Sequence, residues 1–105
     1  MSNHAFSAMQ ILFSPSLFKL GQLVVTRSIH QMMQEGFDVA PFIQRHMAGD
    51  WGDLCEEDRL LNTEALTYGD RLFSSYNIQW EGETKIWIIT EADRSVTTVL
   101  LPSEY

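Results

Sequence analysis

The chain has 105 residues, of which 45% are hydrophobic and 20% are charged, a composition typical of one globular domain rather than a disordered segment. Fourteen acidic residues against seven basic ones give a formal net charge of −7. This acidic excess argues against direct binding to nucleic acid or to an anionic membrane, because both need a basic surface.

The N-terminal region shows no clear periodicity, and Pro15 interrupts it by removing a backbone donor. We therefore expect residues 1–17 to form a flexible or partner-dependent arm, and residues 18–105 to form a single α+β domain. The apolar segment from Leu20 to Val25 is long enough for one strand.

Three short helices are predicted between residues 26 and 69, because apolar residues recur at helical spacing between capping residues and glycines. The expected starts are Thr26, Asp38 or Val39, and Asp53, and the glycines expected to end the helices are Gly36, Gly49 and Gly69. Asp53 and Glu56 resemble a capping box at the third helix. On that helix the apolar residues expected near one face are Leu54, Leu61, Ala65 and Tyr68, with Leu60 beside it.

The second half of the chain predicts three strands, at residues 71–78, 85–89 and 96–101. Short turns connect them, so neighbours should pair as an antiparallel meander. The run from Ile86 to Ile89 is unbroken and β-favouring, so both faces of that strand should meet protein. The expected fold is α+β, with short helices packed on one face of a three- or four-stranded antiparallel sheet.

Acidic side chains cluster between residues 50 and 58. We favour a charged helix N-terminus as the explanation, because carboxylates there interact well with the helix dipole. The alternative is a divalent-metal site, or a metal-assisted enzyme, that uses His46, Asp50 and Asp53 as ligands.

The turn between the last two strands contains Glu91, Asp93, Arg94 and Ser95. These residues could form an exposed recognition tip, since polar loop residues often carry function. The structural explanation, which we favour, is an Asx turn at Asp93 with Arg94 paired to a nearby acid.

The three tryptophans have different expected roles. Trp87 alternates with isoleucines and is expected in the core. Trp80 flanks a hairpin turn, where it can cover the sheet edge or contact a partner. Trp51 lies between two glycines, either as an exposed interface anchor or, as we favour, as a plug over the helix junction.

No catalytic signature is present in the sequence. Cys55 has acidic neighbours that disfavour a thiolate, and no serine lies in a nucleophile elbow. No cofactor motif is present, and we expect neither an enzyme nor a bound cofactor. With one cysteine, no apolar run of bilayer length and no basic signal-like start, the chain is expected to be cytoplasmic.

Three stretches are similar to a family of small proteins that are encoded on plasmids and integrative elements. The stretches are FKLGQLVVT, HMAGDWGDLCEED and KIWIITEADRSVTTVLLPSEY, with GDWGDL and WIITEADRS the most specific. The resemblance runs from about Phe18 to Tyr105 and implies a mobile-element setting, but it brings no catalytic residues. In similar proteins proline usually follows the helix-capping threonine, whereas Arg27 stands here.

Our leading hypothesis is a small acidic accessory factor of a mobile element that binds a protein with a basic surface. Inhibition of a host defence protein or of a nucleic-acid-binding protein is its candidate action. The candidate contact residues are Asp50, Trp51, Asp53, Glu57, Trp80, Glu91, Asp93 and Arg94. The alternatives are the metal site at His46, Asp50 and Asp53, and a dimeric structural module joined through a sheet edge or the N-terminal arm.

Overall fold

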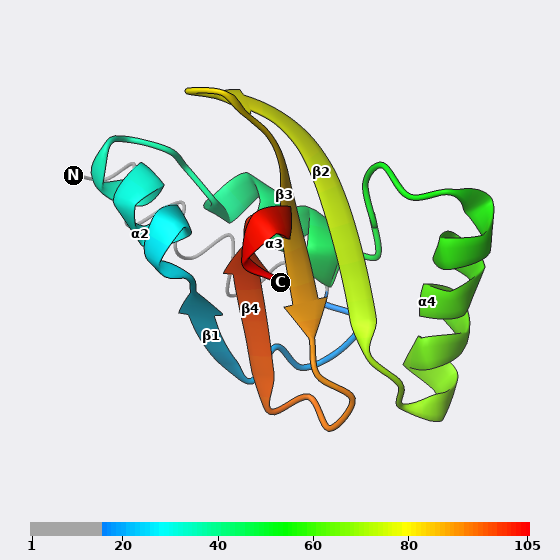
Figure 1. The fold of residues 1–105 in the computed structure, drawn as a ribbon. Helices are drawn as coiled ribbons and strands as arrows, with labels where there is room; N and C mark the ends of the chain where they lie inside the picture. The colour runs from blue at the N-terminus through cyan, green and yellow to red at the C-terminus, as the bar shows by residue number, and fades with distance from the viewer. Residues whose placement is uncertain (1–15) are drawn as a thin grey trace, which may run out of the picture.

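The computed structural model describes residues 16–105, so most of the expected N-terminal arm lies outside the described residues. The fold is α+β, as the sequence predicts (Figure 1). In chain order the elements are β1 (Gln22–Val25), α2 (Arg27–Gln34), α3 (Ala40–Met47), α4 (Glu56–Tyr68), β2 (Leu72–Trp80), β3 (Glu83–Thr90), β4 (Val96–Leu100) and the short 3₁₀ helix η1 (Pro102–Glu104).

The sheet has four strands in the order β1-β4-β3-β2. The meander β2-β3-β4 is antiparallel, as expected from its short turns. β1 pairs with β4 in parallel, from Gln22 opposite Val96 to Val25 opposite Val99, so the expectation of an all-antiparallel sheet is wrong for this strand. A four-residue apolar strand far from its partner in the sequence carries no signal for its direction.

Gly21 allows β1 to lie this close to β4. Its φ is +66°, and a Cβ atom at this position would be only 2.3 Å from the carbonyl oxygen of Ser95. The ladder begins immediately afterwards, where the amide of Gln22 donates to that same carbonyl at 2.8 Å. Only glycine tolerates both the positive φ and the close approach.

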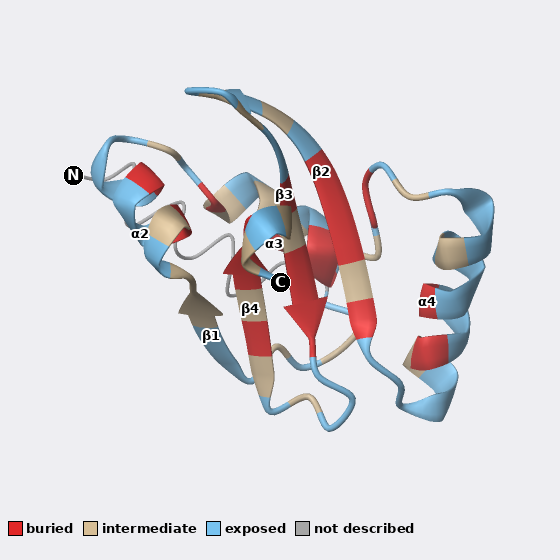
Figure 2. Cartoon of the chain, viewed as in Figure 1, coloured by how far each residue is buried: buried red, intermediate tan, exposed pale blue. Residues whose placement is uncertain are grey.

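The main core lies between one face of the sheet and the helices α2 and α3. Figure 2 shows the buried residues concentrated along the central strands and on the helix faces that meet them. Side chains from both layers form one cluster: Ile29, Met32, Val39, Ile43, Met47, Tyr76, Ile86, Ile88, Val99 and Leu101. On the opposite face of β3, Trp87 is half-buried between Phe73 and Tyr105. The expectation that Trp87 lies in the core is therefore wrong, because this face of the sheet is only partly covered.

α4 packs beside β2 at the edge of the sheet remote from β1 (Figure 1). Its buried face includes Ala65, as expected, but Leu61 and Tyr68 are 61% and 76% exposed, which corrects the face assigned from the sequence. Asn62 is buried instead. The face of α4 that meets β2 therefore differs from the apolar face of the sequence pattern, because the side-chain amide of Asn62 bonds the edge of β2, as described below.

α4 also begins later than the sequence suggests. It starts at Glu56 with Cys55 in the N-cap position, so Asp53 does not cap it. Glu56, Glu57 and Asp58 do occupy the first turn, where negative charge is favourable. Gly69 ends the helix in a left-handed conformation, as predicted.

None of the helices within residues 16–105 combines the length and the apolar composition needed to cross a membrane.

Candidate functional site

The loop Asp50–Asp53 closes the outer edge of β2. The amide of Ser75 donates to the carbonyl of Trp51 at 3.1 Å, and the amide of Asp53 donates to the carbonyl of Ser75 at 2.6 Å. Gly52 makes this possible, because a Cβ atom there would be 2.1 Å from the Ser75 carbonyl oxygen. The loop therefore pairs with an edge strand that would otherwise expose unpaired backbone groups.

Side chains continue this closure on both sides of the loop. The carboxylate of Asp53 accepts the amide of Asn77 at 2.9 Å. Asn62 accepts the amide of Phe73 at 3.0 Å and donates to its carbonyl at 2.6 Å. Asp53 thus has a structural role on β2, which replaces both the helix-cap and the metal-ligand interpretation.

Asp50 also serves the loop. Its carboxylate accepts hydrogen bonds from Arg45 Nε at 2.7 Å and from the amide of Gly52 at 3.2 Å. The hydrogen bond from Arg45 is the main cause that lowers the pKa of Asp50. The hydroxyl of Tyr76 donates to the Asp50 carbonyl at 2.7 Å, and burial raises the pKa of this tyrosine to about 12.

Trp51 is 4% exposed and contacts His46 edge-on, with ring centroids 5.6 Å apart. Phe18 stacks on Trp51 with ring centroids 6.2 Å apart and also contacts His46 edge-on at 5.2 Å. Trp51 is therefore buried as the plug that we favoured and is not an exposed interface anchor.

His46 is completely buried, and both of its ring nitrogens contact hydroxyl groups. Nδ1 lies 2.5 Å from Ser74 Oγ, and Nε2 lies 2.9 Å from Thr90 Oγ1. A further hydrogen bond joins Thr90 Oγ1 to Thr97 Oγ1 at 2.8 Å, and the Thr97 hydroxyl donates to the carbonyl of Leu20 at 2.7 Å.

The direction of this chain of hydrogen bonds fixes the tautomer of His46. The carbonyl of Leu20 can only accept, so Thr97 donates to it and accepts from Thr90. Thr90 must then accept from His46, which carries its proton on Nε2, while Ser74 donates to Nδ1. With both nitrogens engaged, His46 has no lone pair available for a metal.

Burial and the positive charge of Arg94 lower the pKa of His46 to about 3, so the ring is neutral. Within residues 16–105, no three His, Cys, Asp or Glu side chains lie close enough to hold a metal ion. The arrangement of His46, Asp50 and Asp53 therefore gives no support to a metal site.

The turn after β3 is also structural at two of its positions. Asp93 accepts the amide of Ser95 at 3.0 Å, which is the expected Asx turn, and hydrogen bonds from Ser95 lower the pKa of Asp93. The expected pairing of Arg94 with an acid is wrong, because its guanidinium donates instead to the carbonyls of Ala65 at 3.0 Å and Asp70 at 2.7 Å. It thereby ties the turn to the end of α4.

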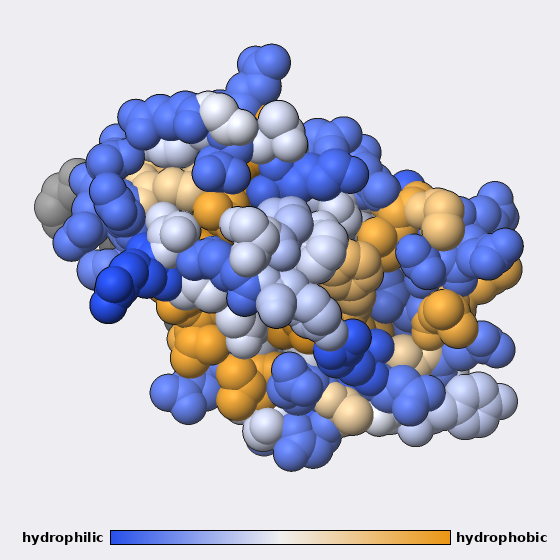
Figure 3. Space-filling view, viewed as in Figure 1, coloured by the Kyte–Doolittle hydropathy of each residue, from blue (hydrophilic) through white to orange (hydrophobic). Residues whose placement is uncertain are grey.

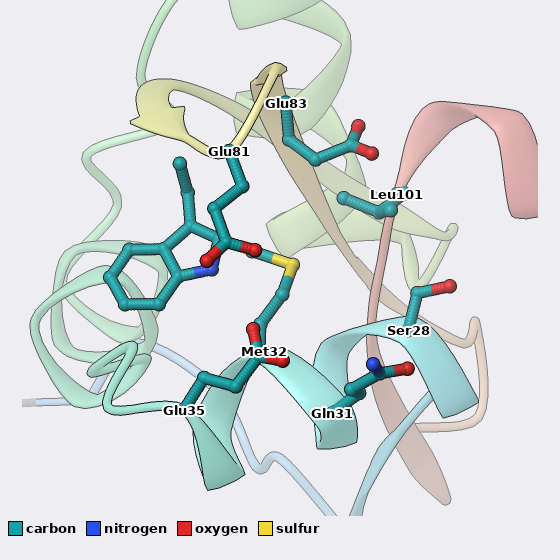
Figure 4. A pocket seen from close by; sticks show the side chains of 8 residues that line it. Ser28, Gln31, Met32, Glu35, Glu81, Glu83 and Leu101 are labelled. Carbon is teal, nitrogen blue, oxygen red and sulfur yellow. The ribbon is translucent and has the colours of Figure 1, made fainter.

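A small pocket opens between α2 and the β2–β3 hairpin, and we call it the Trp80 pocket. Its volume is about 180 Å³, and its walls include the apolar side chains of Met32, Trp80 and Leu101. Three carboxylates surround them, from Glu35, Glu81 and Glu83. In Figure 4, Glu81 and Glu83 extend from the hairpin and Glu35 rises from α2, with Met32 between the two elements.

The indole Nε1 of Trp80 is buried at this pocket and has no hydrogen-bond partner. A buried donor without an acceptor is costly, on the order of 1–3 kcal/mol, and is unusual in a folded protein. The half-buried ring also packs against Phe37 at 5.3 Å. Trp80 thus packs against the core and also lines the pocket.

All the acidic candidate contact residues are exposed, but only Glu57 and Glu91 have no structural hydrogen bond from their side chains within residues 16–105, and Trp80 lies at the pocket. Glu35, Glu81 and Glu83 were not predicted as a group. Glu81 and Glu83 follow Trp80 closely in the sequence, which was a local signal for two of the three acids. The approach of Glu35 depends on the packing of α2 against the hairpin and had no sequence signal.

Models of known protein families, curated proteins and solved structures were compared with the chain, and none of them matches it.

Proposed function

We propose that this chain is a small protein-binding factor whose acidic surface docks on a partner with a basic surface. The observation that carries the proposal is that the acidic side chains are almost entirely unpaired by internal cations. All charged residues fall within residues 16–105, and the ion pair between Arg45 and Asp50 is the one formed there.

Three other arginines direct their guanidinium groups at backbone carbonyls or aromatic groups instead of acids. Arg59 donates to the Gly52 carbonyl at 2.6 Å, Arg94 to the carbonyls at the end of α4, and Arg71 to the Tyr105 hydroxyl at 2.9 Å. The internal cations therefore hold loops in place while most of the carboxylates are exposed, and Figure 3 shows hydrophilic residues over much of the visible face. A surface field of this sign attracts basic partners and repels nucleic acid.

The mobile-element setting implied by GDWGDL and WIITEADRS suggests which partners to consider. A host defence protein or another nucleic-acid-binding protein has the basic surface that this field favours. Occupying that surface would block its access to nucleic acid. Such an action fits a reducing cytoplasm, where the single exposed Cys55 would remain a thiol.

A capture experiment tests this proposal. The tagged chain is compared with a variant in which six acids, five of them exposed and Glu83 half-buried, are neutralised: Glu35→Gln, Glu57→Gln, Glu64→Gln, Glu81→Gln, Glu83→Gln and Glu91→Gln. Host proteins are captured at about 50 mM salt and released at about 500 mM, where the Debye length is only a few ångströms. The captured protein is then purified and titrated against both chains.

We expect saturable, salt-sensitive binding by the native chain and at least tenfold weaker binding by the variant. Circular dichroism of both chains verifies that the variant is folded. Recovery of no saturable partner, or equal binding by the neutralised variant, would refute the proposal.

A further inference from the structure

The β2–β3 hairpin extends beyond the end of β4 and leaves part of β3 without a neighbour. β3 runs from Glu83 to Thr90, but β4 pairs only with its second half, beginning where Leu100 faces Trp87. The chain then enters η1, which lies beside β3 but begins at Pro102, a residue with no amide to continue the ladder. The first half of β3, residues 83–86, therefore has a strand on one side only among residues 16–105.

This free segment contrasts with the opposite edge of the hairpin. There the Asp50–Asp53 loop and Asn62 satisfy the backbone groups of β2 one after another. No turn or loop backbone within residues 16–105 bonds to Thr84 or Lys85. An open edge of this kind is the usual template for an added strand.

Two pockets border the free segment and share Glu83. The Trp80 pocket lies toward α2, and a second pocket of about 300 Å³ lies toward η1, where Thr84, Lys85 and Pro102 are among its lining residues. We call these two adjoining pockets, with the backbone of residues 83–85 beside them, the groove. The sheet also has an edge at β1, but no residue of β1 lines either pocket.

The chemistry of the Trp80 pocket indicates which side chain it would accept. Its lining contains three carboxylates and no lysine or arginine. An indole ring beside carboxylates is a favourable environment for a cation, because the ring face and the acids both attract positive charge. At about 180 Å³ the pocket is smaller than the 300–1,000 Å³ typical of small-molecule sites, so it suits one side chain better than a cofactor.

The indole Nε1 of Trp80 supplies a further requirement. This donor lacks an acceptor in the structure, and a peptide segment lying in the groove brings backbone carbonyls that can accept from it after a small movement of the Glu81–Gly82 turn. At Gly82, which has a φ of +88°, an added Cβ atom would meet no atom within 4 Å, so this side of the turn is not packed against other residues that the structure describes. A cationic side chain on an extended backbone satisfies the carboxylates and the indole together.

We propose that this groove binds an extended segment of a partner protein, which pairs with residues 83–86 of β3 and places an arginine or lysine side chain in the Trp80 pocket. The inference rests on the proposed function and adds the docking site and the kind of segment. Lys85 lines the second pocket, so the preference for a cation applies to the Trp80 pocket.

Peptide titration by nuclear magnetic resonance of the ¹⁵N-labelled chain tests the site. The probes are blocked β-favouring peptides of about seven residues with arginine, lysine, glutamine or glutamate at the centre. We expect the arginine and lysine peptides to shift the Trp80 indole signal and the amides of residues 83–86. N-methylation of the peptide backbone should weaken binding about tenfold, because it removes a strand-pairing donor.

Two matched variants separate the site from the overall charge. Glu35→Gln, Glu81→Gln and Glu83→Gln together neutralise the pocket, and Glu56→Gln, Glu64→Gln and Asp70→Asn remove the same charge at exposed positions elsewhere. The first variant should bind the arginine peptide at least tenfold more weakly, and the second should bind within about twofold of the native chain.

Shifts confined to other residues, equal binding of the glutamine peptide, or equal losses in the two variants would overturn the groove as the site. If the native chain binds its captured partner in a salt-sensitive way while no arginine or lysine peptide binds, this inference is wrong and the proposed function stands. If neither the partner nor a peptide binds, both are wrong.

Discussion

Thr26 donates its hydroxyl hydrogen to Oε1 of Glu104 at 2.6 Å, a contact that joins the start of α2 to the last turn of the chain. Glu104 also accepts the amides of Leu101 at 2.9 Å and Ser28 at 3.3 Å. Thr26 stands at the N-cap position as its sequence pattern predicts, but its side chain does not cap the helix. A carboxylate from the far end of the chain does so instead.

Replacing Glu104 should therefore destabilise the fold. Glu104→Ala removes three hydrogen-bond acceptor contacts and a favourable charge at the start of α2, so the free energy of unfolding should fall by about 1–2 kcal/mol. Glu104→Gln keeps part of the hydrogen bonding and should lose less. Urea denaturation measures both, with the exposed Glu91→Gln as the control that should change stability by less than about 0.5 kcal/mol. An unchanged midpoint for Glu104→Ala would contradict this role.

The close approach of Gly52 to β2 predicts a difference between two glycines with the same backbone angle. Gly52 and Gly69 both have a φ of +78°, but only at Gly52 does an added Cβ meet other atoms, the Ser75 carbonyl among them. Gly69→Ala should cost about 1 kcal/mol through its conformation alone. Gly52→Ala should cost about 3 kcal/mol or more, because the loop must also move away from the strand.

Thermal and urea denaturation of these two variants provide the measurement. Equal losses of stability at the two positions would show that the Asp50–Asp53 loop does not hold the edge of β2 in the described way.

The buried His46 predicts how stability depends on pH. Burial and Arg94 lower the pKa of His46 from 6.5 to about 3, so below pH 6.5 the unfolded chain binds a proton that the folded chain does not. The free energy of unfolding should be greatest above pH 6.5 and fall by up to about 1.4 kcal/mol per pH unit from there toward pH 3. Asp50 and Glu104, whose pKa values are lowered, act in the same direction only below their ordinary values of 3.8 and 4.5.

Urea midpoints measured from about pH 7.5 to about pH 5 isolate the contribution of His46. His46→Gln should be less stable throughout, because Ser74 and Thr90 lose their partner, but its stability should vary less over this range. The ¹⁵N shifts of the native ring should also show a proton on Nε2 and none on Nδ1. A native profile that is flat down to pH 5, or the opposite tautomer, would contradict the hydrogen-bond chain.

Features that depend on neighbouring residues could be predicted from the sequence. β-branched runs located β3 and β4, and Gly69 marked the end of α4, because strand preference and helix termination are decided within a few residues. Pro41 lies in the first turn of α3, where its fixed φ and missing amide are tolerated.

Features that depend on distant residues could not be predicted. Asp53 looks like a helix cap in the sequence, and only the position of β2 makes it an acceptor for Asn77. Leu61 has the spacing of a core residue, but Asn62 faces the sheet because the β2 edge needs its amide. The Trp80 pocket also joins acids from α2 and the hairpin, which lie far apart in the chain.

The affinity of the native chain for its captured partner, titrated over a series of salt concentrations, tests the central claim most directly. We expect the affinity to fall steeply as salt increases, and the variant with Glu35→Gln, Glu81→Gln and Glu83→Gln to bind weakly with a shallower salt dependence. Affinity that is independent of salt and unchanged in that variant would contradict the claim that the surface carboxylates around Trp80 recognise a basic partner.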